Sequence, residues 1–398
     1  MNNVFIDVDY AQIYKHGQKI GGDVFLLSRN PDNNQIVATL SDGLGSGVKA
    51  NVLASLTAHM AHKLSFSPID LNHSAKIIMD TLPVCKERKI SYSTFTIADI
   101  RYKENNEDIE VNLVEYDNPP SLRFSGSTPI KWERDKTELQ REGAFKKEVV
   151  AASQFKLAIG ERLVMFSDGV TQSGLGKSLP LGWRLDGVRA FVQKEIEANP
   201  DISSRELSRA IVQKANSLDG LCSKDDITCV VVYIRRPRRT LIVTGPPFTK
   251  EADKILGEKI AAFDGKKIVS GGTTAQIVAR LFGKKLTLDM KCWSKDVPPA
   301  SKMEGIDLVT EGMLTLSQVA TILEKKINPT DLSDNPAKRF VEILLDSDQV
   351  HFIVGTKINE AHQDPNIPVE IGIRRTIIGR LRKALEEIYL KETSQEYL

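Results

Sequence analysis

The sequence predicts an α+β domain over residues 1–236, followed by a smaller α/β domain with a mainly parallel sheet over residues 240–398. In the first part, β-rich runs follow one another and the helical patterns are grouped between them. In the second part, strands and helices alternate, which is typical of a parallel sheet. A short charged segment that contains a proline separates the two parts, and 398 residues are enough for two or three domains.

The first part begins with a strand, a turn and a second strand. Residues 24–29 are mostly apolar, residues 30–34 (NPDNN) are typical of a turn, and residues 35–40 are again mostly apolar. An antiparallel hairpin of this kind would bring Asp23 and Asp42, at its two outer ends, close together.

Helices and further strands follow this hairpin. Apolar residues recur at helical spacing from Leu44 to Leu64, and a second helix is expected near residues 74–85. The β-rich runs then span residues 93–102, 108–116 and 156–168, and helices are expected at 183–198 and 203–218. Residues 226–234 (DITCVVVYI) form the last predicted strand of this domain.

The segment Arg235-Arg236-Pro237-Arg238-Arg239 marks the predicted domain boundary, because a proline flanked by charges does not continue a central strand. A basic nucleic-acid patch is the alternative, but the absence of interleaved aromatic residues favours a solvated linker. Strands are expected after this boundary at residues 240–245, 266–271, 285–290 and 349–356. Helices are expected at 250–262, 274–282, 316–325, 337–345 and 377–388, with an irregular region before residue 316.

Composition excludes several classes of function. The 54 Lys and Arg residues nearly balance the 52 Asp and Glu residues, so no bulk field attracts the chain to nucleic acid or to an anionic membrane. The four cysteines show no C-x-x-C spacing, which indicates reduced thiols. No stretch resembles a signal peptide or a membrane span, so a cytoplasmic protein is expected.

Four acidic motifs recur at the ends of apolar runs: residues 21–23 (GGD), 41–43 (SDG), 167–169 (SDG) and 225–228 (DDIT). One Asp beside Gly is ordinary turn chemistry. Four of them in one domain indicate a cluster of carboxylates, which would repel one another unless divalent cations are bound. Carboxylate oxygens without accompanying His or Cys suit Mg²⁺ or Mn²⁺ better than Zn²⁺.

In their order along residues 1–235, GGD, SDGLGSG, FSDGVTQSG and DDIT resemble the motifs of the metal-dependent protein phosphatases (PPM), in particular the SpoIIE-like and RsbX-like bacterial branch. The resemblance implies a four-layer αββα sandwich. It also implies a serine/threonine protein phosphatase that uses two Mn²⁺ or Mg²⁺ ions and hydrolyses a phosphoprotein with a water that the two ions activate.

The resemblance implies a role for each acidic position. Asp42 would bridge the two ions, with the backbone carbonyl of Gly43 as a further ligand of one of them. Asp23 would ligate the first ion directly or through water, and Asp168 and Asp225 would hold the second. The four aspartates would thus act in catalysis through the water that the ions activate.

Two neighbours would support these ligands without binding metal: Asp226 would orient Asp225, and Thr228 would fix the turn. The sequence departs from the family pattern at Val24, at Ser46 and around Pro119-Pro120, positions that shape the substrate surface. The implied substrate is a partner-switching regulator such as an anti-sigma antagonist. A catalytically silent phosphoprotein-binding scaffold and a two-metal small-molecule phosphoesterase are the alternatives.

In the second domain, Gly271, Gly272, Thr273 and Thr274 lie between a predicted strand and a predicted helix. Free backbone amides there could hold a phosphate or nucleotide, although a plain turn with a threonine cap explains the pattern equally well. The domain is therefore expected to bind a small-molecule effector, to dock a partner or to form a homodimer. No nucleic-acid or membrane partner is expected.

Overall fold

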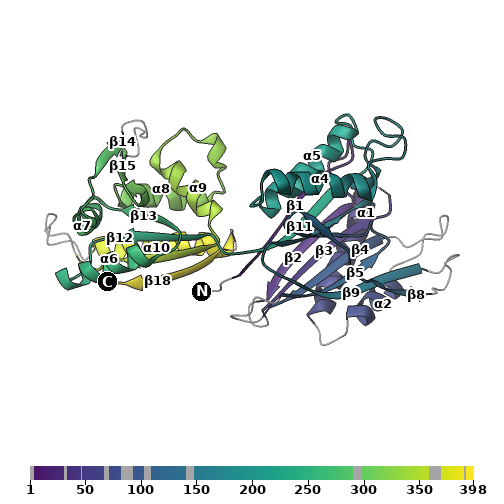
Figure 1. The fold of residues 1–398 in the computed structure, drawn as a ribbon, viewed down its shortest axis with the longest axis horizontal. Coiled ribbons are helices and arrows are strands. Elements are labelled where there is room, and N and C mark those ends of the chain that lie inside the picture. The colour runs from purple at the N-terminus through teal and green to yellow at the C-terminus, as the bar shows by residue number, and fades with distance from the viewer. Residues whose placement is uncertain are drawn as a thin grey trace. The chain divides into compact units, whose positions relative to one another are not determined.

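The computed structural model describes residues 4–30, 34–45, 47–66, 71–81, 93–102, 109–139, 148–289, 298–357, 369–389 and 391–398. The chain divides into two compact units, one ending at Arg236 and the other beginning at Pro237 (Figure 1).

The first unit contains two antiparallel sheets. The six-stranded sheet has the order β2-β3-β4-β5-β9-β8, with β2 at Asp23–Asn30, β3 at Gln35–Gly43, β4 at Ser93–Arg101, β5 at Ile109–Tyr116, β9 at Glu148–Leu157 and β8 at Asp135–Leu139. The five-stranded sheet has the order β1-β11-β10-β6-β7, with β1 at Phe5–Ile13, β11 at Ile227–Arg235, β10 at Glu161–Phe166, β6 at Leu122–Ser125 and β7 at Thr128–Ile130.

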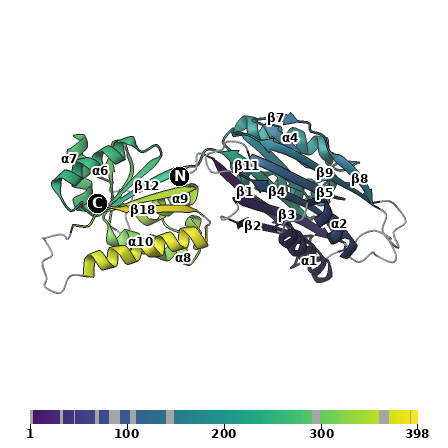
Figure 2. The same ribbon diagram turned by 90° about the horizontal axis from the view of Figure 1, so that it is seen from below.

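Helices cover the outer face of each sheet (Figures 1 and 2). Helices α1 (Val48–Ser65) and α2 (Leu71–Thr81) pack on the six-stranded sheet. Helices α3 (Asp168–Gln172), α4 (Arg184–Ala198) and α5 (Ser204–Leu218) pack on the five-stranded sheet. Apolar side chains fill the space between the sheets as well. This αββα arrangement confirms the predicted fold class.

Strand β3 shows why this part of the sequence reads as continuously apolar. Ile36, Ala38 and Leu40 face the layer between the two sheets, while Val37 faces α1 and α2. Both faces of the strand are therefore buried, and an alternating apolar and polar pattern is absent.

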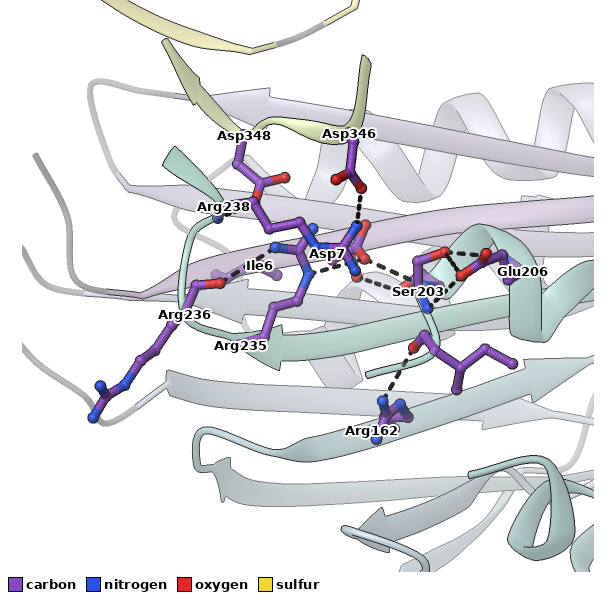
Figure 3. A network of polar contacts seen from close by, with 12 residues as sticks. Ile6, Asp7, Arg162, Ser203, Glu206, Arg235, Arg236, Arg238, Asp346 and Asp348 are labelled. Atoms are coloured by element: carbon purple, nitrogen blue, oxygen red, sulfur yellow. Dashed lines mark hydrogen bonds and ion pairs between the residues drawn. The ribbon is translucent and has the colours of Figure 1, made fainter. Parts of the chain in front are cut away.

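Polar contacts fix α5 against β1 (Figure 3). Asp7 on β1 accepts a hydrogen bond from the backbone N–H of Ser204 at 3.2 Å and forms an ion pair with Arg235 at 3.3 Å. The helix begins with a capping box, because the Ser203 side chain and the Glu206 side chain each accept a hydrogen bond from the other's backbone N–H. The start of α5 is therefore fixed on the sheet.

The second unit is an α/β fold with a mainly parallel sheet, as predicted. Its order is β14-β15-β16-β13-β12-β17-β18, with β14 at Thr287–Asp289, β15 at Ala300–Met303, β16 at Ile306–Thr310, β13 at Lys266–Ser270, β12 at Arg239–Thr244, β17 at Gln349–Val354 and β18 at Glu392–Tyr397. The five neighbouring strands β16, β13, β12, β17 and β18 are parallel to one another. Strand β15 pairs antiparallel with β16, and β14 pairs antiparallel with β15.

Both faces of this sheet are covered by helices. Helices α6 (Lys250–Ala262) and α7 (Gly272–Phe282) contribute to one core. Helices α8 (Met313–Glu324), α9 (Pro336–Asp346) and α10 (Val369–Glu387) contribute to the other. Arg238, just before β12, donates its backbone N–H to Asp348 at 2.7 Å and pairs with Asp346 at 2.7 Å (Figure 3).

Three strands of this sheet, β15, β16 and β18, differ from the expectation. The region before residue 316 was expected to be irregular, but β15 and β16 lie there, and β16 pairs directly with β13. Only Leu308, Val309 and Thr310 of β16 are buried, so its apolar signal is too short to stand out. Strand β18 (ETSQEY) gives no apolar signal because it is an edge strand that pairs only with β17.

Among the described residues, no helix is long and apolar enough to cross a bilayer.

Candidate metal centre

The hairpin of β2 and β3 places two of the predicted aspartates opposite each other. In the antiparallel register Asp23 pairs directly with Asp42, and the next pair is Val24 with Ser41. Asp23 is 3% exposed, so its carboxylate lies inside the protein at the outer end of the hairpin. The predicted proximity of these two residues is thus present in the fold.

The other two aspartates come from the five-stranded sheet. Asp168 is the first residue of α3 and follows the end of β10 after Ser167. Asp225 lies just before β11, whose neighbour in the sheet is β10. The ends of two adjacent strands therefore deliver Asp168 and Asp225, and they face the pair that the other sheet supplies.

Close backbone packing explains the glycine that follows Asp in two of the motifs. A Cβ atom on Gly43 would overlap the backbone carbonyl of Ala50 in the first turn of α1. A Cβ atom on Gly169 would overlap the backbone carbonyl of Asp226. Each glycine thus allows a second chain segment to approach the carboxylates.

Hydrogen bonds link the two sheets at the same place. The Thr228 hydroxyl on β11 donates to Asp23 Oδ2 at 2.6 Å. The Asp226 carboxylate accepts from the backbone N–H of Gly22 at 2.5 Å and from that of Lys15 at 2.9 Å. The backbone N–H of Asp226 donates to Asp225 Oδ1 at 3.0 Å, and the role expected for Asp226 in orienting Asp225 stays a prediction.

Burial is the main cause of raised pKa values in this cluster. It raises the pKa of Asp23 to about 7, although Thr228 and Ser167 donate hydrogen bonds that oppose the shift. Burial also raises the pKa of Asp42 well above its ordinary range, and the negative charges of Asp23, Asp168 and Asp225 add to the effect.

The pKa of Asp168 rises to about 6 through burial and the charge of Asp225. The pKa of Asp225 is also raised, again mainly by burial. The four predicted ligands are therefore close enough to repel one another.

This donor set fits hard divalent cations. It consists of carboxylates and nearby backbone carbonyls, and positive charge among them would remove the repulsion that raises their pKa values. Within the described ranges, however, no three Asp, Glu, His or Cys side chains form a group that could hold an ion as they stand. The carboxylates share one region without forming a finished set of ligands.

Three residues of the site were not predicted. Ser167 is fully buried, and its hydroxyl accepts from the backbone N–H of Thr228 at 3.1 Å. Gln172, one turn along α3, donates to Asp168 Oδ2 at 2.7 Å. Asp117 raises the pKa of Asp168 by its charge and has a positive φ of 57°. The signal for Ser167 was present, because serine precedes aspartate in both SDG motifs.

A pocket of about 420 Å³ adjoins this region and includes Asp117 in its lining. Arg134 and Lys136 supply positive charge there, and Trp132 supplies an aromatic wall. The Arg134 guanidinium stacks over the Trp132 ring at 3.9 Å and pairs with Glu115 at 2.8 Å. The lining thus carries two cationic and two acidic side chains, Glu115 and Asp117, together with the Trp132 ring.

Solved structures of phosphatases are similar to part of this chain. The phosphatase domain of SpoIIE from Bacillus subtilis is 18% identical, with 59% of this chain and 95% of that chain covered and a TM-score of 0.43. RsbX in complex with magnesium is 15% identical over 59% of this chain and 100% of its own, with a TM-score of 0.40.

The catalytic domain of the serine/threonine protein phosphatase PstP, in complex with two manganese ions, is 14% identical. The alignment covers 58% of this chain and 100% of that domain, with a TM-score of 0.37.

No curated protein matches the sequence. The family model described as Stage II sporulation protein E (SpoIIE) matches residues 32–235, which is about half of the chain and includes three of the four acidic motifs. The chain therefore belongs to the SpoIIE family of PPM-type protein phosphatases.

Proposed function

We propose that residues 1–236 form a serine/threonine protein phosphatase domain that uses two Mn²⁺ or Mg²⁺ ions. The observation that carries the proposal is the meeting of four carboxylates from two different sheets, three of them with pKa values raised partly by one another's charge. Such a cluster destabilises the folded protein unless it binds cations, and a structural role does not require it.

The proposed ligands are Asp23, Asp42, Asp168 and Asp225, with the backbone carbonyl of Gly43. Asp42 is the proposed bridging ligand, because the charges of the other three all act on it. When bound, two divalent cations would activate a water for attack on phosphorus and neutralise the phosphate oxygens. Since the side chains do not form a finished ligand set, we propose that they adjust when the ions bind.

Other residues hold these ligands in place. Thr228 and Ser167 orient the Asp23 carboxylate through hydrogen bonds. Asp226 holds the backbone at Gly22, directly before Asp23. Gln172 donates a hydrogen bond to one oxygen of the Asp168 carboxylate. These contacts limit how far the ligands can move when the ions bind.

The proposed substrate is a phosphoprotein, such as a partner-switching regulator of the anti-sigma antagonist type. The pocket that Asp117 shares with the carboxylate region supports a peptide substrate, because Lys136 in its lining can attract a phosphorylated segment. Membership of the SpoIIE family supports the same substrate class.

Two alternatives make different predictions. A phosphoprotein-binding scaffold would bind a phosphoserine peptide without hydrolysing it. A small-molecule phosphoesterase would hydrolyse an aryl phosphate but not a phosphoserine peptide. The cluster of mutually repelling carboxylates favours an enzyme over a scaffold, because a scaffold gains nothing from its electrostatic cost.

The first experiment tests the site by metal-dependent hydrolysis. The full chain should hydrolyse p-nitrophenyl phosphate and a phosphoserine peptide with Mn²⁺ and lose both activities with chelator. Asp168→Asn should lower kcat/KM by about a thousandfold, because a neutral amide no longer helps to hold the ion. Asp186→Asn is the matched control, since Asp186 is exposed in the first turn of α4 and pairs with Arg189 on the same helix.

Calorimetric titration of Mn²⁺ into both variants gives a second readout. Asp168→Asn should bind Mn²⁺ more weakly than the Asp186→Asn control. Full activity and full Mn²⁺ affinity in a folded Asp168→Asn protein would refute the assignment.

For residues 240–398 we propose a regulatory role through a ligand or a partner. The expected cytoplasmic location and the possible homodimer remain predictions.

A further inference from the structure

Two helices of the second unit begin side by side. Helix α7 follows β13, helix α8 follows β16, and these two strands are parallel neighbours with Ser270 opposite Thr310. Each helix begins after a glycine with positive φ, 127° at Gly271 and 142° at Gly312. A Cβ atom on Gly312 would lie only 3.2 Å from the Cα atom of Gly271, so the two helix starts are in contact.

Neither of these helix starts has a side-chain cap. Other helices of the same unit are capped, since Thr249 accepts from the backbone N–H of Ala252 in α6 and Asn335 accepts from that of Lys338 in α9. The first N–H groups of a helix have no partner within the helix. The N–H groups at the starts of α7 and α8 both lie at the carboxyl ends of the parallel strands, beyond β13 and β16.

Both helices also carry a buried threonine at the third position, Thr274 in α7 and Thr315 in α8, 1% and 0% exposed. As far as the structure describes the chain, neither hydroxyl has a hydrogen-bond partner. The Thr274 Oγ1 atom lies 3.2 Å from the point where a side chain on Gly271 would begin, so it is directed at the helix start. A buried hydroxyl without a partner is unfavourable, and a ligand that accepts its hydrogen bond would remove the cost.

The hydroxyls of the two strand ends, by contrast, are already used. Thr310 donates to the Ser270 hydroxyl at 2.9 Å, and Ser270 is 3.5 Å from the carbonyl of Gly312. Solvent reaches the helix starts, because Gly272 and Thr273 are exposed. The N–H of Gly272 already donates to the Glu311 carbonyl at 3.0 Å, so it is not one of the available donors. The N–H groups of the next residues of α7 and α8, and the Thr274 and Thr315 hydroxyls, lie beside this accessible surface.

The usual ligand position of an open α/β sheet is filled in this protein. That position lies where the strand order reverses, at the carboxyl ends of β12 and β17. There, a Cβ atom on Gly355 would overlap the backbone of Gly245 and Pro246. The side chain of Arg374 also enters, with Nη1 donating to the Gly355 carbonyl at 3.3 Å. A ligand is better accommodated at the ends of β13 and β16.

We propose that residues 271–274 and 312–315 together bind the phosphate group of a small phosphorylated ligand. Two helix N-termini direct positive partial charge at one place, and apart from the N–H of Gly272 their first N–H groups and the threonine hydroxyls can donate to a phosphate. The sequence predicted a ligand loop at residues 271–274 alone. The start of α8, at residues 312–315, is a second part of the proposed site that the sequence did not indicate. It concerns the second unit alone and stands or falls independently of phosphatase activity.

Hydrogen–deuterium exchange of the full chain with and without inorganic phosphate tests the site locally. Chelator is present throughout, so that the carboxylates of the first unit hold no cations and repel phosphate. Peptides that contain residues 271–275 and 312–316 should both exchange more slowly with phosphate. Unchanged exchange in both peptides at saturating phosphate would overturn the proposal.

Replacing the threonines tests the hydroxyls. Thr274→Val and Thr315→Val should each weaken the apparent binding of phosphate about tenfold, because each removes one hydrogen bond to an anion. Without phosphate, each variant should melt at or above the temperature of the unchanged protein, since it removes a buried hydroxyl that has no partner. This second outcome shows that weaker binding is not a folding defect.

Thr321→Val is the matched control. Thr321 lies in the middle of α8, and its hydroxyl donates to the carbonyl of Ser317 at 3.0 Å. The Thr321→Val control should bind phosphate as tightly as the unchanged protein. Thr274→Ser should also bind phosphate with that affinity, because serine retains the hydroxyl. Equal phosphate affinity in the Thr274→Val, Thr315→Val and Thr321→Val variants would refute the role of the hydroxyls.

Titration with AMP at the same concentrations distinguishes the source of the phosphate group. Tighter binding of AMP than of inorganic phosphate, lost in Thr274→Val, would identify a nucleotide site. Equal binding, also lost in that variant, would identify a site for the phosphate group alone. Binding of AMP that Thr274→Val leaves unchanged would place the ligand elsewhere and contradict the proposal.

Discussion

At the scale of single residues, the four aspartates are costly to the folded protein when no cation is bound. Burial and mutual repulsion raise their pKa values, so deprotonation at neutral pH occurs at the expense of stability. Asp168 is the simplest case, because its pKa is about 6 in the folded protein and 3.8 ordinarily.

The sign of the resulting pH dependence follows directly. The folded state of the chelated protein binds a proton at Asp168 more tightly than the unfolded state does. The stability from this group is therefore fully present below pH 3.8 and is lost as the pH rises through about 6.

We expect Asp168→Asn, which cannot ionise, to gain stability over the unchanged protein across the same range. The gain should reach at most about 3 kcal/mol near pH 7. Urea unfolding in chelator at several pH values measures the difference, and a difference that stays constant between pH 4 and pH 7 would contradict the raised pKa. At a Mn²⁺ concentration far above the dissociation constant of the unchanged protein the order should reverse, because the cations bind the protein with all four carboxylates more tightly and so stabilise it more.

Lys136 provides a second prediction at this scale. It lines the pocket beside the carboxylates, so Lys136→Ala should raise KM for a phosphoserine peptide about threefold to tenfold and leave p-nitrophenyl phosphate hydrolysis nearly unchanged. Lys131→Ala is the control, because Lys131 is also exposed but does not line the pocket. Equal effects of the two substitutions on the peptide would rule out a role for the pocket in peptide binding.

At the scale of elements, the site depends on how closely chain segments approach one another. The Asp168-Gly169 turn passes directly against the backbone of Asp226, with no room for a side chain on Gly169. The hairpin end is similarly tight, because Gly43 lies against the first turn of α1.

Gly169→Ala should therefore destabilise the first unit by about 3 kcal/mol or more, since backbone atoms must move to make room. Gly379→Ala is the comparison, because Gly379 is exposed on α10 with open space around it. That substitution should stabilise α10 by about 0.5–1 kcal/mol through helix propensity. Thermal unfolding of both variants measures the contrast, and a Gly169→Ala protein as stable as the unchanged chain would show that the turn can relax.

The sequence predicted those elements whose apolar pattern is long and continuous. The β2–β3 hairpin could be predicted because turn residues interrupt two apolar runs, and α6 could be predicted because its apolar face repeats over thirteen residues. The short strand β16 and the polar edge strand β18 could not be predicted in this way, since pairing with neighbours rather than composition defines them.

The same limit applies to the sites. The motifs predicted the four aspartates, but the contribution of Asp117 depends on a fold that brings the end of β5 near α3. The neighbouring start of α8 could not be linked to Gly271 from the sequence, because about forty residues separate them.

At the scale of the whole molecule, each unit has apolar cores of its own. Three cores separate the four layers of the first unit, and two cores flank the sheet of the second. Such an organisation is typical of domains that fold independently.

We therefore expect a fragment of residues 1–236 to fold alone and to keep Mn²⁺-dependent hydrolysis of p-nitrophenyl phosphate within about threefold of the full chain. Circular dichroism and kinetics measure both properties. A fragment that folds but has lost activity would show that the second unit completes the active site, and a fragment that does not fold would refute independent domains.

The position of Trp132 has a practical consequence. The indole lies in the wall of the pocket, beneath the Arg134 guanidinium and 5.5 Å from the Phe155 ring. A ligand that displaces the Arg134 guanidinium would change the surroundings of the Trp132 indole, which is a natural fluorophore. Tryptophan emission spectra could therefore follow ligand binding to the pocket in real time without any attached dye.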